Sequence, residues 1–481
     1  MRWWWPAKQQ QIITAPPPAP PPASWVREVL GQVSWLPRAY AEWWRRLLRE
    51  SPEHVAVETL LIIFVVFLLF GWRKKKEAAP LSEQEIEELC AEWEPEPLVP
   101  LLKKKTTAVV TAYGPGAVAI DGRTLLNFGA LDCLGMSLEP RLKEAATAAL
   151  RKYGCGSCGP RGFYGSIDLH VELEKKVAAF FGAEKAIAFS DASSCATSTV
   201  AAFAKRGDLL LVDFGVSEPL QTGCVLSRAQ VVVFRDADEL ERTMISIERD
   251  DFAKKRTPGS QRRFVVCEAI SRDFGTVAPL SRIVDLKNKF GYRLILDESL
   301  TFATTGATGR GIKEELGLPS DAVEITTIDL GPALGSVGGI CVGTKEVIDH
   351  QRLSGAGYCF SAAAPPFVSA AAMAALDIVP ERLPRLRENV KFLHDQLSSV
   401  AGLSKLSAYP SPVIFLANPN KPLRTIVDVL KTKGFALALA HDNNLKSLLP
   451  PRSPAIRVAI SARHSKPQLT SLSDFLLKIQ P

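Results

Sequence analysis

Tryptophan is missing from most of this chain. The sequence has nine tryptophans in 481 residues, and none lies after Trp93. The tryptophan ring is apolar while its N–H needs a polar partner, so tryptophan is typical of the boundary between membrane and water. The N-terminal region therefore differs in kind from the rest of the chain.

Cysteine and histidine are too scattered to form a disulfide framework or a metal site. The nine cysteines are mostly isolated, and the one C-x-x-C pair, Cys155 and Cys158, has no second pair to complete a zinc site. We expect these two thiols to be buried or partly buried in a glycine-rich turn. His54, His394 and His441 show no metal-ligand spacing, so no metal is predicted.

Charge of one sign is not strongly in excess. The net charge is +7, and part of it lies in two runs, Arg73–Lys76 and Lys103–Lys105. No aromatic residues alternate with these runs to stack on bases, so we interpret them as membrane-flanking and predict no nucleic-acid partner.

An apolar run, Val55–Trp72, predicts a single transmembrane helix. It has 18 residues, close to the lower limit for a span, and four basic residues follow it. A buried core helix is the alternative. The proline-rich spacer Pro16–Pro22 precedes Trp25–Arg49, which we expect either to lie in the membrane interface or to pack on its own protein. Many unpaired cysteines follow the span, so we place the C-terminal side in the cytosol.

From about residue 106 onward, strand-like and helix-like segments alternate. The candidate strands are Leu209–Val212, Val231–Phe234, Phe264–Cys267, Leu294–Leu296 and Gly339–Val342. Short apolar strands in this alternation predict an α/β fold with a mostly parallel sheet covered by helices.

The pattern changes near Pro380–Pro384, which predicts a smaller C-terminal α/β domain that starts with a helix over Arg385–Val400. We therefore divide the chain into an N-terminal region (1–54), a transmembrane helix (55–72), a linker with a short acidic helix (73–105), a large domain (106–380) and a small domain (381–481).

The glycine-rich segment Thr327–Ile340 is typical of a loop in which a lysine amine binds pyridoxal phosphate (PLP) as a Schiff base. Counting back from Gly338, the lysine position holds Pro332, which has no amine. Asp297 ends a predicted strand, where an aspartate can pair with the pyridine nitrogen of that cofactor. Taken alone, Asp297 would be better interpreted as a helix cap or a turn residue, but its position 35 residues before Pro332 favours the cofactor role.

From Leu81 to its end, the chain resembles the α-oxoamine synthase group of fold-type-I PLP enzymes. Within that group it is most similar to the lysine-lacking long-chain-base subunits of eukaryotic serine palmitoyltransferase. The segment Tyr153–His170 carries the resemblance most strongly. Supporting segments are Leu81–Cys90, Ile295–Ser299, Asp349–Ser354 and Ile460–Ser465.

The resemblance implies that this chain is not catalytic by itself. Active members have histidines where this sequence has Ser217 and Leu300, and lysine where it has Pro332. Asp297 and Arg457 remain at positions that contact the cofactor and the substrate carboxylate in active members. The surrounding sequence has changed further, which indicates that Asp297 is vestigial.

The resemblance also implies a partner, because two subunits of a fold-type-I enzyme share each active site. We expect a heterodimer with a lysine-bearing homologue whose lysine holds PLP, joined by small membrane regulatory subunits. The segment Gly154–Gly165 is expected to reach the partner through Arg161 and Tyr164, with Cys158 at the same edge. A structural turn with Arg161 in a salt bridge is the alternative. A second interface loop is expected at Gly357–Ser361.

The implied function is that of a non-catalytic serine palmitoyltransferase subunit in the endoplasmic reticulum membrane, with its globular part in the cytosol. The complex would condense L-serine with palmitoyl-CoA to 3-ketosphinganine, in sphingolipid biosynthesis. Two alternatives stay open at this point. One is an active PLP enzyme that uses another lysine, and the other is a membrane-bound scaffold or regulator without synthase activity.

Overall fold

The computed structural model describes residues 40–43, 45, 46, 49, 52–71, 81–93, 109–114, 116–257, 259–400, 402–418, 423–440 and 454–478. The chain forms two compact units, Met1–Lys105 and Thr106–Pro481. Several sequence predictions lie outside the described residues: the proline-rich spacer, most of Trp25–Arg49 and both basic runs.

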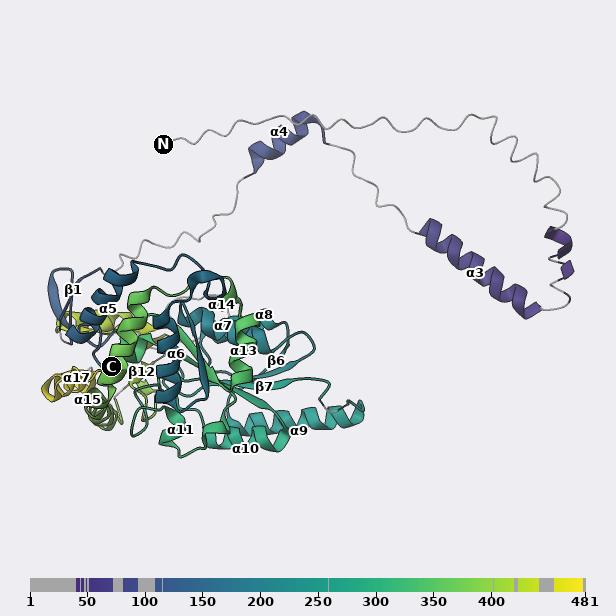
Figure 1. The fold of residues 1–481 in the computed structure, drawn as a ribbon. Coiled ribbons are helices and arrows are strands. Elements are labelled where there is room, and N and C mark those ends of the chain that lie inside the picture. The colour runs from purple at the N-terminus through teal and green to yellow at the C-terminus, as the bar shows by residue number, and fades with distance from the viewer. Residues whose placement is uncertain are drawn as a thin grey trace. The chain divides into compact units, whose positions relative to one another are not determined.

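The first unit contains the helices α3 (Pro52–Gly71) and α4 (Glu83–Glu92) (Figure 1). The helix α3 covers nearly all of the predicted span, and its described apolar side chains, such as Leu60 and Phe67, are exposed within this unit. No helix within the described residues is both long enough and apolar enough to cross a membrane. The predicted transmembrane helix is therefore not confirmed.

The short acidic helix predicted before the large domain is confirmed as α4. It begins with a capping box in which the backbone N–H of Glu85 donates to Ser82 Oγ (3.3 Å) and the backbone N–H of Ser82 donates to Glu85 Oε2 (2.8 Å). This reciprocal pair satisfies two amide donors that a helix start leaves open.

A seven-stranded sheet forms the centre of the second unit, in the order β4-β10-β9-β8-β7-β5-β6. All its strands run in one direction except β10, which is antiparallel to both neighbours. The predicted mostly parallel sheet is confirmed, and each of the five candidate strands lies in it. The strands are β4 (Lys185–Phe189), β5 (Leu209–Asp213), β6 (Gln230–Phe234), β7 (Arg263–Glu268), β8 (Arg293–Asp297), β9 (Ile325–Asp329) and β10 (Gly339–Gly343).

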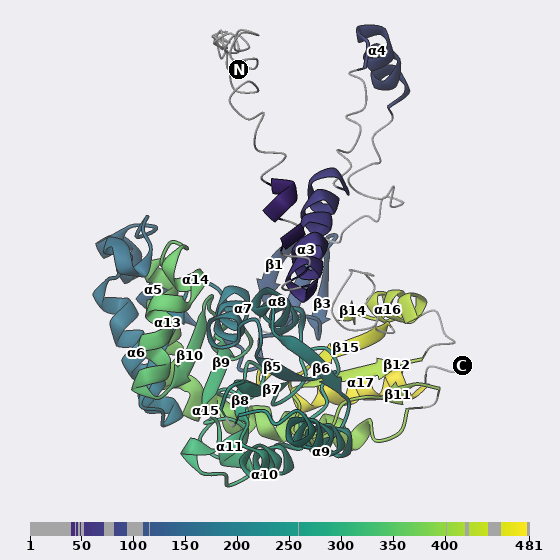
Figure 2. The same ribbon diagram turned by 90° about the vertical axis from the view of Figure 1, so that its right-hand side faces the viewer.

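Helices cover both faces of this sheet. Figure 2 shows α7 (Ala192–Phe203) and α8 (Glu218–Ser227) on one side, and α9 (Ala237–Ala253) and α10 (Leu280–Phe290) on the other. Successive strand residues face opposite sides, so Leu210 belongs to the core cluster of the first side while Leu211 belongs to that of the second. Burial on both faces explains why the strands are continuous apolar runs rather than alternating ones.

Two four-stranded sheets flank the central one, in the orders β1-β2-β3-β13 and β11-β12-β15-β14. Their strands are β1 (Val110–Gly114), β2 (Ala117–Ile120), β3 (Arg123–Asn127), β11 (Ser404–Lys405), β12 (Val413–Ala417), β13 (Phe435–Ala436), β14 (Ala438–Ala440) and β15 (Ala455–Ala459). The remaining helices are α5 (Pro140–Tyr153), η1 (Arg161–Gly165), α6 (Asp168–Phe181), α11 (Ile312–Glu315), η2 (Ser320–Ala322), α12 (Gly331–Leu334), α13 (Lys345–Ser354), α14 (Ala356–Cys359), α15 (Pro366–Gln396), α16 (Leu423–Thr432) and α17 (Lys466–Lys478).

The predicted helix start near Arg385 is wrong. A single helix, α15, continues through Pro380 and Pro384, and it packs against α5, α6 and α17. Proline removes one amide donor and clashes with the preceding turn, but a long buried helix can compensate through tertiary packing. The pairing of β13 with β3 also joins the C-terminal part of the chain to strands near residue 125.

Candidate functional site

Acidic side chains gather at the carboxyl edge of the central sheet. Asp213, Glu268, Asp297 and Asp329 are the last residues of β5, β7, β8 and β9, and Asp191 follows β4. Because these strands are parallel, their carboxyl ends meet at one edge, where open α/β sheets bind ligands. We call this the acid edge.

Glu268 and Asp297 lie side by side in the ladder between β7 and β8, and both are buried. Asp297 accepts hydrogen bonds from the Ser299 backbone N–H (2.9 Å) and from Thr327 Oγ1 (2.6 Å). Glu268 accepts from the backbone N–H groups of Ser217 (2.9 Å) and Arg272 (2.7 Å). Burial raises the pKa of both carboxyls, and the charge of Asp297 raises that of Glu268 further.

Asp213 is a third acid of this edge and is half-buried. Its carboxylate accepts a hydrogen bond from the Gly215 backbone N–H. Burial raises the pKa of Asp213 to about 6, and the bond from Gly215 only partly opposes the shift.

Pro332 lies in the first turn of α12 and is buried. Its backbone carbonyl accepts a hydrogen bond from the Cys133 N–H (2.8 Å), so the segment before α5 packs against the place where a Schiff-base lysine would stand. Proline offers no amine there. Within the described residues, no lysine lines the cavity that opens at the acid edge and is described below.

The two histidine positions carry structural roles instead. Ser217 is the N-terminal cap residue of α8, and its backbone N–H donates a hydrogen bond to Glu268. Leu300 is buried in an apolar cluster with Val413 and Phe415. With no amine at Pro332 and no ring at Ser217, the residues present do not fit a covalently held PLP.

Arg457 sits on β15, close to Arg272. Its Nη2 donates to the Gly129 carbonyl (2.7 Å), whereas its buried Nε has no hydrogen-bond partner among the described residues. Burial and the charge of Arg272 lower the pKa of Arg457. Arg272 itself forms an ion pair with Asp329 (2.9 Å). The position predicted for a substrate carboxylate thus keeps a cation that is bound mainly to backbone.

A cavity of about 640 Å3 opens at the acid edge, between the large sheet and the C-terminal sheet. We call it the edge cavity. Its lining residues are Asp213, Phe214, Gly215, Arg235, Glu268, Ser271, Phe274, Thr276, Val277, Ala278, Pro279, Ser404, Leu406 and Ala417.

The glycine-rich segment Gly154–Gly165 presents some of its predicted residues outward and buries another. Tyr164 is fully exposed and has a positive φ of 64°. Cys155 and Cys158 are also exposed, which corrects the expectation of buried or partly buried thiols in this turn. The turn is tight because Gly165 packs against the backbone of Gly159 and has no room for a Cβ.

Arg161, predicted to reach outward, points into the protein. Its Nη1 lies 2.9 Å from Glu174 Oε1, and both side chains are less than one-tenth exposed. Its Nε donates to Ser166 Oγ (2.9 Å). Glu174 also accepts from the Ala188 backbone N–H (2.9 Å) and lies 3.5 Å from Arg352. The salt-bridge alternative therefore describes Arg161 correctly.

The second predicted interface loop lies beside the first. A bridge joins Pro160 to Ala362, and the Ala363 N–H donates to the Gly159 carbonyl (2.9 Å). Ser361 is half-buried at this junction. Large apolar side chains are exposed on these two segments and on the adjoining end of α13, and we call them the loop patch: Phe163, Tyr164, Leu353 and Phe360.

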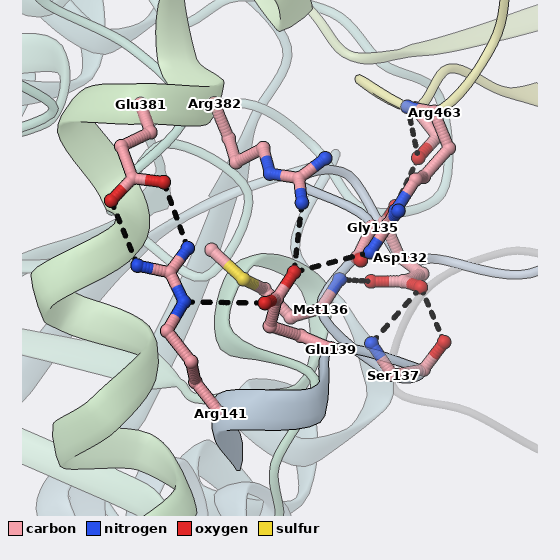
Figure 3. Close-up of polar contacts among 10 residues, drawn as sticks. Asp132, Gly135, Met136, Ser137, Glu139, Arg141, Glu381, Arg382 and Arg463 are labelled. Carbon is pink, nitrogen blue, oxygen red and sulfur yellow. Dashed lines mark hydrogen bonds and ion pairs between the residues drawn. The ribbon is translucent and has the colours of Figure 1, made fainter. Parts of the chain in front are cut away.

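Sequence reasoning missed a buried carboxylate, Glu139, that contacts three arginines (Figure 3). It lies 3.2 Å from Arg141, 2.8 Å from Arg382 and 3.3 Å from Arg463. Burial opposes its ionisation, but the hydrogen bond from Arg141 and the charges of the three arginines outweigh burial and lower its pKa. Arg141 also forms a two-point pair with Glu381, both bonds at 2.8 Å.

This cluster ties the segment before α5 to α15 and to the loop after β15. Beside it, Asp132 closes a turn by accepting from the Met136 N–H (2.7 Å) and from Ser137 Oγ (2.6 Å), and Arg463 Nε donates to the Gly135 carbonyl (3.0 Å) (Figure 3). No local pattern marks these contacts, because the partners of Glu139 on α15 and after β15 lie hundreds of residues along the chain.

Residues 123–476 match the family model for aminotransferase class I and II. Long chain base biosynthesis protein 1b of Oryza sativa subsp. japonica is 38% identical over 444 residues, covering 89% of this chain and 91% of that protein. Serine palmitoyltransferase 1 of Dictyostelium discoideum is 33% identical over 459 residues, covering 90% and 95%.

Among solved structures, the chain is similar to a serine palmitoyltransferase variant from S. paucimobilis with a bound PLP–myriocin aldimine. The TM-score is 0.70 at 24% identity, and the match covers 77% of this chain and 91% of that one. This likeness shows the fold, an α/β fold of the PLP-dependent transferase type. Matching the family model over most of its length, the chain belongs to the aminotransferase class I and II family.

Proposed function

We propose that this chain is a non-catalytic subunit of serine palmitoyltransferase, in sphingolipid biosynthesis. The complex would condense L-serine with palmitoyl-CoA and release CO2 and CoA, giving 3-ketosphinganine. The names of relatives that align over about nine-tenths of both chains support the assignment to this enzyme.

The observation that carries the non-catalytic role is the buried Pro332. A Schiff base needs a primary amine, and no rotation or deprotonation of a proline side chain can supply one. The losses at Ser217 and Leu300 point the same way, because both positions now serve the packing of α8 and of the core.

A lysine-bearing homologue is the proposed partner, and its lysine would hold PLP. The loop patch supports a protein partner, because four large apolar side chains on adjacent segments are exposed in this unit. Patches of this kind mark interaction sites. In this proposal Tyr164 and Phe163 contact the partner, and Cys158 lies at the margin of the interface, while Arg161 holds the loop from inside.

A membrane location, in the endoplasmic reticulum with the second unit in the cytosol, is also part of the proposal. Its support is the apolar run Val55–Trp72 followed by basic residues. Both the acyl-CoA substrate and the long-chain product are amphipathic, which suits an enzyme held at a bilayer. Small membrane regulatory subunits would bind to the same complex.

The location of the Schiff base tests the proposal. This chain and a lysine-bearing homologue from the same organism are purified as a complex and treated with borohydride, which reduces any Schiff base to a stable adduct. Mass spectrometry then identifies the modified lysine. We expect the adduct on the homologue and none on this chain; an adduct on any lysine of this chain would favour the active-enzyme alternative. Failure of the two chains to purify together would favour the scaffold alternative.

A further inference from the structure

The edge cavity has a size and lining suited to a small organic ligand. Its volume of about 640 Å3 lies within the usual range for such sites. Most of its wall is apolar, and Phe214 and Phe274 form a stacked pair whose ring centroids are 6.0 Å apart. Val277 and Leu406 continue this apolar wall toward the C-terminal sheet.

Two carboxylates line the same cavity, the half-buried Asp213 and the buried Glu268. Neither forms an ion pair with a cation within 4 Å among the described residues, and their hydrogen-bond donors are neutral backbone amides. The nearby cations have other partners. Arg272 pairs with Asp329, and Arg235, which lines the cavity with a largely exposed side chain, pairs with Glu239 and lies over the Phe214 ring. Buried negative charge without a cation is costly, so a cationic ligand would be favoured here.

The arrangement favours an organic cation over a metal ion. Within the described residues, no three side chains of histidine, cysteine, aspartate or glutamate are placed to hold a metal. Aromatic faces add a favourable contact for an ammonium group, and apolar walls favour a hydrocarbon chain attached to it.

We propose that the edge cavity binds a primary amine with a long apolar chain. The ammonium group lies at Asp213 and Glu268, and the chain runs along Phe274, Val277 and Leu406. The product of the proposed reaction is an amine of this class, so only the identity of the natural ligand rests on the proposed function. The cavity would then hold product on the non-catalytic chain, where no Schiff base competes for the amine.

Photolabelling of the co-purified complex tests this inference. Three probes share one alkyl chain and one diazirine, and they differ only in carrying an amine, a hydroxyl or a carboxylate. After irradiation and digestion, mass spectrometry locates the labels. We expect the amine to label the peptides that contain Phe274, Val277 and Leu406 at least about tenfold more than the other two probes, since one buried charge contact is worth that much. Excess dodecylamine should remove this labelling.

Two variants separate the charge from the shape of the site. Asp213→Asn/Glu268→Gln keeps the oxygen acceptors and removes both charges, and Ala278→Phe fills the cavity with both acids intact. Each should reduce amine labelling of the cavity wall at least about tenfold. The control Asp285→Asn/Glu388→Gln removes two exposed acids and should leave labelling unchanged.

Equal labelling of the cavity wall by all three probes would overturn the inference, and so would unchanged labelling in both variants. The readout does not depend on catalysis. Cavity labelling in a complex without synthase activity would therefore sustain the binding site while refuting the proposed function. Loss of labelling to dodecylamine but not to 3-ketosphinganine would overturn the identification with the product class.

Discussion

Breaking the buried pair between Arg161 and Glu174 should destabilise the second unit strongly. Arg161→Met leaves Glu174 buried with only Arg352, 3.5 Å away, to balance it. Glu174→Gln leaves the Arg161 guanidinium buried without a counter-charge. Removing one member of a buried ion pair costs about 3–5 kcal/mol. Arg352 compensates part of the loss in Arg161→Met, so that variant should fall at the lower end.

The double variant makes the reasoning specific. Arg161→Met/Glu174→Gln buries no charge, and the glutamine can still accept the Ala188 N–H. Replacing both members of a buried pair by neutral groups is often close to neutral. The double variant should therefore cost no more than the worse single variant, with a coupling free energy of about 1–3 kcal/mol.

Thermal unfolding at a fixed scan rate measures these differences. With about 2.1 cal/mol/K of unfolding entropy per residue, a unit of the length of Thr106–Pro481 loses about 1.3 °C in melting temperature per kcal/mol. We expect losses of about 4–6 °C for the single variants. The control Lys254→Met breaks an exposed pair with Asp250 and should change the melting temperature by less than about 1 °C. Additive single losses, or an Arg161→Met loss equal to that of the control, would refute the reasoning.

Three further outcomes are expected. Burial raises the pKa of Asp213 from 3.8 to about 6, so the folded chain binds that proton more tightly than the unfolded chain, and stability falls as pH rises between these values. Asp213→Asn should therefore raise the free energy of unfolding by about 3 kcal/mol near pH 7.5 and by roughly half that near pH 5. Thermal unfolding at the two pH values measures this difference, and an equal gain at both would contradict the expectation. Pro332→Lys should give no visible absorption with PLP, because both histidine positions are also changed; a new visible band would contradict this. Phe163→Ser/Phe360→Ser should reduce recovery of the lysine-bearing homologue in co-purification at least about tenfold, whereas Phe252→Ser, an equally exposed site elsewhere, should not.

The central sheet was predictable because burial on both faces makes its strands continuous apolar runs. Two strands were missed, β4 and β9. Two of the five residues of β4 are alanines, which are depleted in strands, and the polar pair Thr326 and Thr327 interrupts the apolar run of β9. Both strands are recognisable only once their neighbours are in place.

The two prolines led to a wrong predicted start for the helix near Arg385. Pro380 and Pro384 normally end a helix, but α15 continues through both because its buried face packs against several other helices. At this point tertiary packing outweighs the low helix propensity of proline.

The candidate site was partly predictable, but the buried polar contacts around it were not. Pro332 was located by counting back from Gly338 in its glycine-rich loop, and Asp297 was located at the end of a predicted strand. The burial of Arg161 and the three arginines around Glu139 depend on residues that meet only in the folded chain. A single sequence carries no signal for such pairs.

Co-expression tests the central claim most directly. This chain, a lysine-bearing homologue from the same organism, and the two together are each assayed for 3-ketosphinganine from L-serine and palmitoyl-CoA. We predict product only when both chains are present, because this chain lacks the amine at Pro332 and the homologue lacks its partner. Product from this chain alone, or an equal rate from the homologue alone, would contradict the account.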